Sequence, residues 1–370
     1  MNHHPTPPIW NNHDDMRYRR KLMLLCGLSP LLSSCATNFS QHKNTSPSDL
    51  ARQLGICSTS YATLKHGQMD QIQTVAGCSN KHPLTADAIF QAASLTKPVT
   101  AYAALQWALA GKLDLTKPVS HYLPRGYTHF HNVLARTVND PHDVMPPSAL
   151  SNIPLGTLLN HTSGLPNWSS QAMNPSPAPG QHWQYSGEGY MLLQSVLEAV
   201  SGQNFSDFMD SQVFGPLDMR HSSLVWHEQH HSEVHSDAIP GLWAPRPGKF
   251  KHALAAASLY TTAPDYAKFL CAVLRQEKLL ALTLSSPVMV DRSLGIEWGY
   301  GWGIERSNNG PHLWHWGNNP GFRSFAMFSP ASGDGFVAFT NHHQGINMAA
   351  RIAQDVLPGE HQAFNFHMVS

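Results

Sequence analysis

The chain has 370 residues, of which 42% are hydrophobic and 13% are charged, and its 24 basic side chains balance 24 acidic ones. A formal charge of zero excludes the strongly basic surface that nucleic acids require, so no nucleic-acid partner is expected. The hydrophobic fraction excludes a wholly disordered chain, and the length suffices for one large domain or two around a substantial core.

The first 35 residues have the three parts of a secretory signal. A basic stretch begins at Arg17, a short apolar run covers 22–25, and Leu32-Ser33-Ser34-Cys35 follows. This last sequence resembles the lipobox of bacterial lipoproteins, in which the cysteine is lipidated and becomes the first residue. The apolar run is too short to span a bilayer. We therefore expect residues 1–35 to be a signal peptide, with Met16 as an alternative start. Lipidation of Cys35 would anchor the exported protein to a membrane of the cell envelope, facing the periplasm.

Residues 36–50 are rich in Ser, Thr and Asn and predict a tether, so the folded domain is expected at about 51–360. Residues 55–77 alternate around His66-Gly67 and predict a β-hairpin. Cys57 is expected in the first strand and Cys78 just after the second. The sequence leaves a disulfide between them open, because it does not give the Cα separation.

A strongly apolar helix is expected from about Ser94 to Ala110, with Gly111 ending it. Because it is apolar on nearly every face, it should lie at the centre of the protein. Residues 111–249 predict an inserted helical part without clear strands, whose best helices cover 189–200 and 205–214. The stretch 126–150 lacks periodicity and is expected to be an irregular surface insertion.

The C-terminal part predicts a helix at 264–275, strands near 312–317, 322–328 and 335–340, and a last helix near 346–356. Cys271, in the first of these helices, is expected to be an inert core thiol. Strands near both ends with helices between them indicate one sheet built from both ends of the chain. The α/β part would then comprise about 51–110 and 250–360.

Ser94-Leu95-Thr96-Lys97-Pro98 stands at the head of the buried helix. Proline is tolerated in the first turn of a helix, so Pro98 places the helix start close to Ser94. Residues three apart share a face, so the Lys97 amine can reach the Ser94 hydroxyl. Burial and the helix dipole both disfavour a protonated lysine there, and a neutral lysine can act as the base for a serine.

Two further motifs are Tyr185-Ser186-Gly187 before a helix and His315-Trp316-Gly317 on a predicted strand. In this order, the motifs resemble those of the serine β-lactamase and penicillin-binding superfamily, most closely its class C branch, over about 53–356. Ser94-Leu95-Thr96-Lys97 matches the nucleophile motif, Tyr185 the first position of Tyr-x-Asn, and His315 the start of Lys-Thr-Gly or His-x-Gly. The resemblance implies an α/β fold with an antiparallel sheet flanked by helices, an inserted helical domain, and a site at their seam.

The resemblance also implies catalytic roles. Ser94 would attack a carbonyl and form an acyl-enzyme, while Lys97 and Tyr185 share and deliver its proton, with His315 beside them. Backbone N–H groups of Ser94 and Asn318 would hold the oxyanion. No cofactor and no metal are expected, and the partner would be a small acyl compound, with peptidoglycan fragments among the candidates.

One departure from the family pattern bears on the substrate. Gly187 stands where the family usually has an asparagine that hydrogen-bonds the substrate amide, and an ester has no such N–H to satisfy. Trp316, which with Gly317 should line the substrate site, offers no hydroxyl for a substrate carboxylate. The sequence therefore favours a carboxylesterase-like hydrolase of small esters or amides. A β-lactamase, a D-amino acid peptidase or penicillin-binding protein, and an inactive cell-envelope binding protein remain alternatives.

Two histidine motifs have less specific interpretations. Residues 227–231 match the zinc-protease pattern H-E-x-x-H, but their flanks lack a convincing helix, so we interpret the match as coincidence in a chain with 24 histidines. His161-Thr162-Ser163-Gly164 is interpreted as a structural turn.

Overall fold

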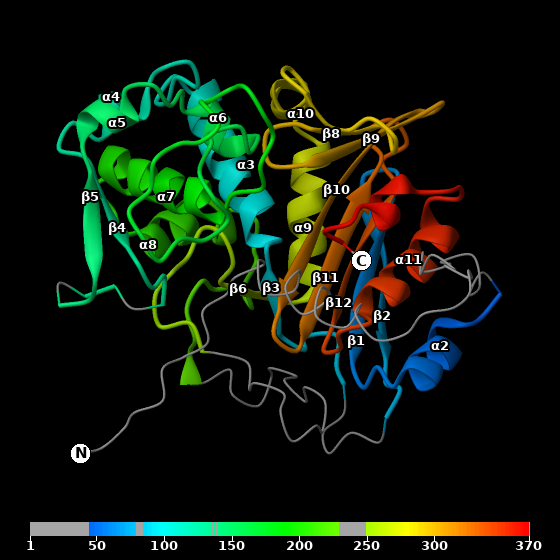
Figure 1. Ribbon diagram of the computed structural model, residues 1–370. Coiled ribbons are helices and arrows are strands. Elements are labelled where there is room, and N and C mark those ends of the chain that lie inside the picture. Colours follow the sequence, from blue (N-terminus) through cyan, green and yellow to red (C-terminus); the bar gives the residue numbers. More distant parts are fainter. Residues whose placement is uncertain (1–43, 79–83, 135, 138, 229–248, 370) are drawn as a thin grey trace, which may run out of the picture.

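The main sheet of the molecule has eight antiparallel strands in the order β2-β1-β12-β11-β10-β9-β8-β7 (Figure 1). The computed structural model describes residues 44–78, 84–134, 136–137, 139–228 and 249–369. The strands are β1 (Thr59–Lys65), β2 (Gln68–Val75), β7 (Val288–Asp291), β8 (Ile296–Trp298), β9 (Gly303–Ser307), β10 (Gly310–Asn319), β11 (Phe322–Phe328) and β12 (Gly335–Thr340). The predicted antiparallel sheet built from both ends of the chain is confirmed, since β1 pairs with β12.

Helices cover both faces of this sheet. Helix α9 (Ala263–Leu274) packs on β1, β2 and β12, and α10 (Glu277–Thr283) lies against it. On the other face α11 (Gly345–Val356) packs on β11 and β12, with α2 (Pro47–Leu54) beside it (Figure 1). The short helix η4 (Gln362–Asn365) lies against β9. Among the described residues no helix combines the length and apolarity needed to cross a membrane.

Helix α3 (Thr96–Leu109) lies between the sheet and the helical part (Figure 1). Eleven of its residues are buried, as expected for a helix apolar on nearly every face. The helical part comprises α4 (Val119–Tyr122), α5 (Pro147–Leu150), α6 (Gly156–Leu159), α7 (Gly187–Ser201), α8 (Phe205–Met209) and the π-helix η2 (Asp210–Phe214). Two small sheets pair β3 (Phe90–Ala93) with β6 (Leu259–Thr261) and β4 (Tyr127–Phe130) with β5 (His142–Met145).

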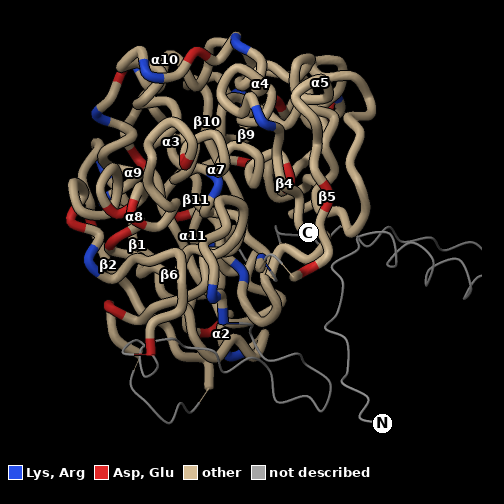
Figure 2. The backbone as a smooth tube through the Cα atoms, turned by 90° about the vertical axis from the view of Figure 1, so that its left-hand side faces the viewer, with Lys and Arg blue, Asp and Glu red and all other residues tan. Residues whose placement is uncertain are grey.

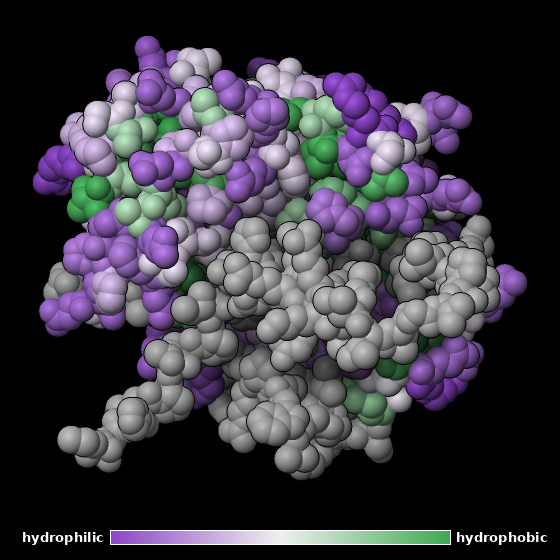
Figure 3. All heavy atoms as spheres, in the orientation of Figure 1, coloured by the Kyte–Doolittle hydropathy of each residue, from purple (hydrophilic) through white to green (hydrophobic). Residues whose placement is uncertain are grey.

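The surface carries mixed charge and polarity. Acidic and basic residues are interspersed along the described chain (Figure 2). On the face seen in Figure 3, apolar residues stand singly or in small groups among hydrophilic ones.

Several expectations need correction. The stretch 126–150 is not irregular, because it contains the hairpin β4–β5 and α5. Residues 47–50, assigned to the predicted tether, are helical instead, since α2 begins at Pro47 after Ser46, whose hydroxyl accepts a hydrogen bond from Asp49 N. The helix expected over 205–214 continues as a π-helix from residue 210. Strands β7, β8 and β9 were not predicted at all.

The two cysteines of the N-terminal hairpin form a disulfide, which the sequence had left open. Cys57 and Cys78 have Cα atoms 4.6 Å apart. Cys57 precedes β1 rather than lying within it, because pairing begins at Thr59. The hairpin turns at His66 and Gly67, both with positive φ, as the right-handed twist of a two-residue hairpin requires. Cys271 is a buried free thiol in α9, as predicted.

Candidate active site

Ser94 lies on a sharp turn between β3 and α3. The preceding Ala93 has φ of 50°, so the chain reverses there and the helix begins at Thr96, two residues later than predicted. The Thr96 hydroxyl donates to Ala93 O at 2.6 Å and accepts from Leu259 N at 3.0 Å, which ties the turn to β6. Left-handed backbone at a non-glycine residue is strained and persists only where the surroundings fix it. The turn is therefore held rigidly under Ser94.

Lys97 places its amine against the serine. Its Nζ donates to Ser94 Oγ at 3.0 Å and to Ala256 O at 2.8 Å. The side chain is 1% exposed, and burial lowers the pKa of Lys97 from 10.5 to about 7. Near neutral pH a large fraction of the amine is therefore unprotonated and able to take a proton from Ser94.

Tyr185 lies over the same amine. Lys97 Nζ is 4.7 Å from the centroid of the Tyr185 ring. Burial raises the pKa of Tyr185 above its usual value, and the nearby Ser94 hydroxyl opposes that rise, although the Tyr185 hydroxyl makes no hydrogen bond among the described residues. The tyrosine is therefore a neutral phenol in the resting site, able to donate its proton or pass one on, rather than a ready base.

His315 is fully buried on β10 beside Tyr185, with ring centroids 6.1 Å apart. Its Nδ1 lies 2.8 Å from Trp316 O, so Nδ1 carries the proton and donates it. Burial, aided by the Lys97 charge, lowers the pKa of His315 to about 3. The ring is thus neutral, and its Nε2, buried without a hydrogen-bond partner among the described residues, presents a lone pair. A family lysine at this position would instead add a cation.

Gly317 allows β10 to approach the Ser94 turn. A Cβ at this position would lie 2.3 Å from Ala92 O and 2.2 Å from Ser324 Oγ, which itself donates to Ala92 O. Any side chain would push the strand away from β3. The adjacent Asn318 is exposed, and Ser94 N donates to no partner among the described residues. The two amides expected to hold an oxyanion thus lie on the two elements that Gly317 brings together.

Gly187 does not face an open cavity. A Cβ there would lie 2.5 Å from Asn167 O and 3.0 Å from the indole of Trp168. The Gly187 amide donates to Asn167 Oδ1 at 3.1 Å. The space into which a side chain at this position would project is therefore occupied by residues 167 and 168.

Trp316 belongs to an aromatic cluster behind Tyr185. Its ring centroid is 5.0 Å from that of Tyr185, and the side chain is buried against Trp298, Trp314 and Phe366. Trp316, which was predicted to line the substrate site, therefore packs against Tyr185 and supports it from one side.

His161, interpreted from the sequence as part of a structural turn, holds the Tyr185 segment from the other side. Its Nδ1 accepts from Ser186 N at 3.1 Å and its carbonyl accepts from Gln184 N at 2.8 Å. Its ring lies 4.5 Å from the Tyr185 ring, and its φ is 60°. Sequence reasoning missed this role, although the turn signal itself was correct.

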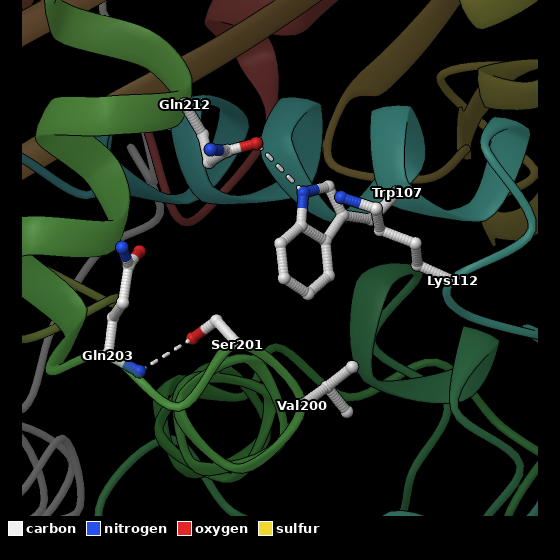
Figure 4. Close-up of a pocket in the computed structure, with 6 residues that line it drawn as sticks. All are labelled: Trp107, Lys112, Val200, Ser201, Gln203 and Gln212. Carbon is white, nitrogen blue, oxygen red and sulfur yellow. Dashed lines mark hydrogen bonds between the residues drawn. The ribbon is translucent and has the colours of Figure 1, made fainter.

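A pocket of about 440 Å³ lies elsewhere, between the end of α3 and the ends of α7 and η2 (Figure 4). Its lining includes Trp107, whose Nε1 donates to Gln212 at 2.9 Å. It contains none of the predicted site residues. Of the H-E-x-x-H match only His227 and Glu228 fall within the described residues, and Cys35 also lies outside them.

Comparisons with known proteins agree with this arrangement. The sequence profile of the family described as Beta-lactamase matches residues 49–358. Penicillin-binding protein 4 of Amycolatopsis lactamdurans is 25% identical over 302 residues, covering 70% of this chain and 73% of its own. Esterase EstB of Burkholderia gladioli is 28% identical over 196 residues, 44% of this chain and 45% of its own.

Other matches are partial in sequence but extensive in structure. Penicillin-binding protein 4* of Bacillus subtilis (strain 168) is 28% identical over 172 residues, which cover 40% of this chain and only 33% of its own length. A β-lactamase/D-alanine carboxypeptidase from Pseudomonas syringae superposes with a TM-score of 0.68 at 17% identity, over 85% of this chain and 97% of its own. A class C β-lactamase superposes with the same score at 19% identity, over 90% of this chain and all of its own.

The structural matches show the fold, and the profile match covers most of the described chain. The resemblance inferred from the sequence motifs is thereby confirmed. The chain belongs to the Beta-lactamase family, within the superfamily of serine β-lactamases and penicillin-binding proteins.

Proposed function

We propose that this chain is a serine hydrolase that forms an acyl-enzyme on Ser94 and acts on small esters in the manner of a carboxylesterase. The observation that carries the proposal is the Lys97 amine, which lies 3.0 Å from Ser94 Oγ and has a pKa near 7. A serine needs a base to become a nucleophile, and a buried lysine that is largely neutral at physiological pH supplies one.

The proton path follows from these positions. Lys97 would take the Ser94 proton as Oγ bonds to the ester carbonyl carbon, and the amides of Ser94 and Asn318 would hold the oxyanion. The proton would then reach the departing alcohol oxygen through the Tyr185 hydroxyl. Water, activated by the same groups in reverse, would release the acid and restore Ser94. Because His315 is neutral, Lys97 becomes the one cation among these four side chains once it has taken the proton.

The crowding around Gly187 supports an ester, rather than an amide, as the substrate. The family asparagine that would bridge to a substrate N–H is absent, and Asn167 O and the Trp168 indole fill the space where it would project. A buried substrate N–H without a partner costs about 1–3 kcal/mol, whereas an ester has no such group. One curated relative is named an esterase, and others are named β-lactamase or penicillin-binding protein.

The test compares p-nitrophenyl butyrate, D-alanine p-nitroanilide and a chromogenic cephalosporin, together with labelling by a fluorophosphonate probe. We expect the ester to have the highest kcat/KM, and Ser94→Ala to lose both turnover and labelling with the fold intact. Undiminished labelling of Ser94→Ala would refute the nucleophile. Faster cephalosporin hydrolysis would establish the β-lactamase alternative, and no turnover or labelling would establish the inactive binding protein.

Gly187→Asn alone is a poor test of selectivity, because its Cβ would collide with Asn167 O. Trp168→Ala would not relieve this contact, because it removes the indole and leaves the Asn167 backbone oxygen in place.

We also propose that the protein is exported and anchored through lipidated Cys35. The Cys57–Cys78 disulfide supports export, because disulfides persist in oxidising compartments. The proposal places the enzyme in the cell envelope, where peptidoglycan-derived acyl compounds are candidate substrates.

A further inference from the structure

We propose that the β4–β5 hairpin carries a transition-metal site of the zinc class, ligated by His129 Nδ1, His131 Nε2 and the carboxylate of Asp143. His129 lies on β4 and His131 directly follows the strand, with its N–H donating to Pro141 O, so the two side chains, two residues apart, lie on one face of the hairpin. Asp143 on β5 is the residue directly paired with His129. The β4–β5 hairpin thus brings the three proposed ligand side chains close together.

The distances suit a single ion. Asp143 Oδ1 lies 2.8 Å from His129 Nδ1 and 2.9 Å from His131 Nε2, and one ligand atom from each residue falls within 4.8 Å of the others. Ligand atoms on one tetrahedral zinc lie about 3.3 Å apart, given Zn–N and Zn–O distances of about 2.0–2.1 Å. Outward movement of the Asp143 carboxylate by about half an ångström would therefore admit the ion.

Glu188 stands behind His129 as a supporting carboxylate. His129 is 1% exposed, and its Nε2 has no hydrogen-bond partner among the described residues. The nearest carboxylate oxygen, Glu188 Oε1, is 3.6 Å away and also buried. A metal on Nδ1 would fix the remaining ring proton on Nε2, where Glu188 can accept it. Metal-bound histidines usually have such a partner, which orients the ring.

The donor set identifies the class of ion. Two imidazoles and one carboxylate suit Zn²⁺, Ni²⁺ or Cu²⁺ rather than the all-oxygen ions Mg²⁺ and Ca²⁺. The side chains of His131 and Asp143 are 30% and 25% exposed, so an ion can enter from solvent and keep a water as its fourth ligand.

A second histidine cluster is less suitable. His361 directs Nδ1 to Glu305 Oε1 at 3.0 Å and Nε2 to Leu357 O at 2.7 Å, and Glu305 Oε2 accepts from Ala363 N. Both nitrogens of this histidine already bond to protein acceptors. Binding a metal there would break a contact that holds the C-terminal segment.

The experiment measures metal binding to the full chain, independently of its hydrolase activity. Protein stripped with EDTA is titrated with ZnCl₂ by calorimetry, and Co²⁺ binding is followed by visible absorption. His131→Ala is compared with His142→Ala, which removes an exposed histidine from the opposite face of the same hairpin. Every other histidine is unchanged in both variants, so adventitious binding contributes equally to both.

We expect the wild type and His142→Ala to bind one more equivalent of Zn²⁺ than His131→Ala. They should also show a four-coordinate Co²⁺ spectrum that His131→Ala lacks. Glu188→Gln should weaken binding about 10–100-fold, as loss of a supporting carboxylate does elsewhere. If His131→Ala fails to fold, Asp143→Asn replaces it. Equal stoichiometry in the two histidine variants, or no Co²⁺ spectrum in the wild type, would overturn the site.

Discussion

The burial that suits Lys97 to its proposed role as a base also lowers the stability of the folded protein. Burial lowers its pKa from 10.5 to about 7. Between these values the unfolded chain binds the proton and the folded chain does not, so the free energy of unfolding rises with pH from about 7 to 10.5. Below pH 7 both states are charged, and the folded state bears the full cost of a buried ammonium.

Lys97→Met should therefore be inactive yet more stable. At pH 6 we expect a gain of about 1–3 kcal/mol in the free energy of unfolding, shrinking as the pH rises toward 10. Denaturant unfolding at several pH values measures it, with Lys278→Met, at an exposed lysine, as the control. In the wild type, kcat/KM for esters should rise with pH around a midpoint near 7. A pH-independent stability difference would contradict the pKa assignment.

At the residue scale, sequence reasoning succeeded where chemistry is local. The pair Ser94 and Lys97 follows from helical spacing, because residues three apart share a face. The crowding around Gly187 could not be predicted from the sequence. Asn167 and Trp168, which crowd it, lie about twenty positions earlier in the chain, and only the fold brings them close. His161 was missed for the same reason.

At the scale of elements, the turn at 161–164 holds the segment that carries Tyr185. His161 accepts backbone hydrogen bonds from residues on both sides of the tyrosine, and its ring packs against the tyrosine ring at a tilt. The histidine is thus a positioning residue, which acts through Tyr185 rather than on the substrate.

Two substitutions at His161 separate the effect of its hydrogen bond to Ser186 N from that of its packing against Tyr185. His161→Asn keeps an acceptor and tolerates left-handed backbone, whereas His161→Phe keeps the ring and loses the acceptor. We expect Asn to retain kcat within a few-fold and Phe to lower kcat about 10–100-fold, with KM little changed, because the loss is one of alignment. A higher kcat for Phe than for Asn at equal stability would show that ring packing, and not the hydrogen bond, positions Tyr185.

Long and strongly periodic elements were predicted well, and short ones were not. The central helix, α7, α9 and the last three strands lie close to their expected positions. The hairpin β4–β5 was missed because each strand has four residues and its inward face carries histidine and aspartate instead of an apolar stripe. The sequence therefore did not predict that the three proposed metal ligands lie together, since an unpredicted hairpin brings them together.

At the scale of the whole molecule, the signal peptide expected at residues 1–35 and the Cys57–Cys78 disulfide favour the same compartment. Cys35→Ser should remove the lipid acceptor, so the protein should move from the membrane fraction to the soluble periplasm or remain unprocessed. Fractionation and mass spectrometry of the mature N-terminus measure this outcome. Cys271→Ser, at the buried thiol of α9, is the control. An unmodified mature N-terminus downstream of Cys35 would refute lipid anchoring.

The pairing of β1 with β12 also determines when the protein can fold. Thr59 pairs with Thr340, so the middle of the sheet is missing until nearly the whole chain has been made. Contacts so distant along the chain form slowly, because the loop between them must first be closed. During synthesis, therefore, the β1–β2 hairpin forms before β12 exists. Until then, the edge of β1 that pairs with β12 is unpaired, and the hydrophobic core is incomplete. On the proposed route of export, such a chain would still be unfolded while it passes through a translocation channel, and its sheet would close only after the last strand had followed.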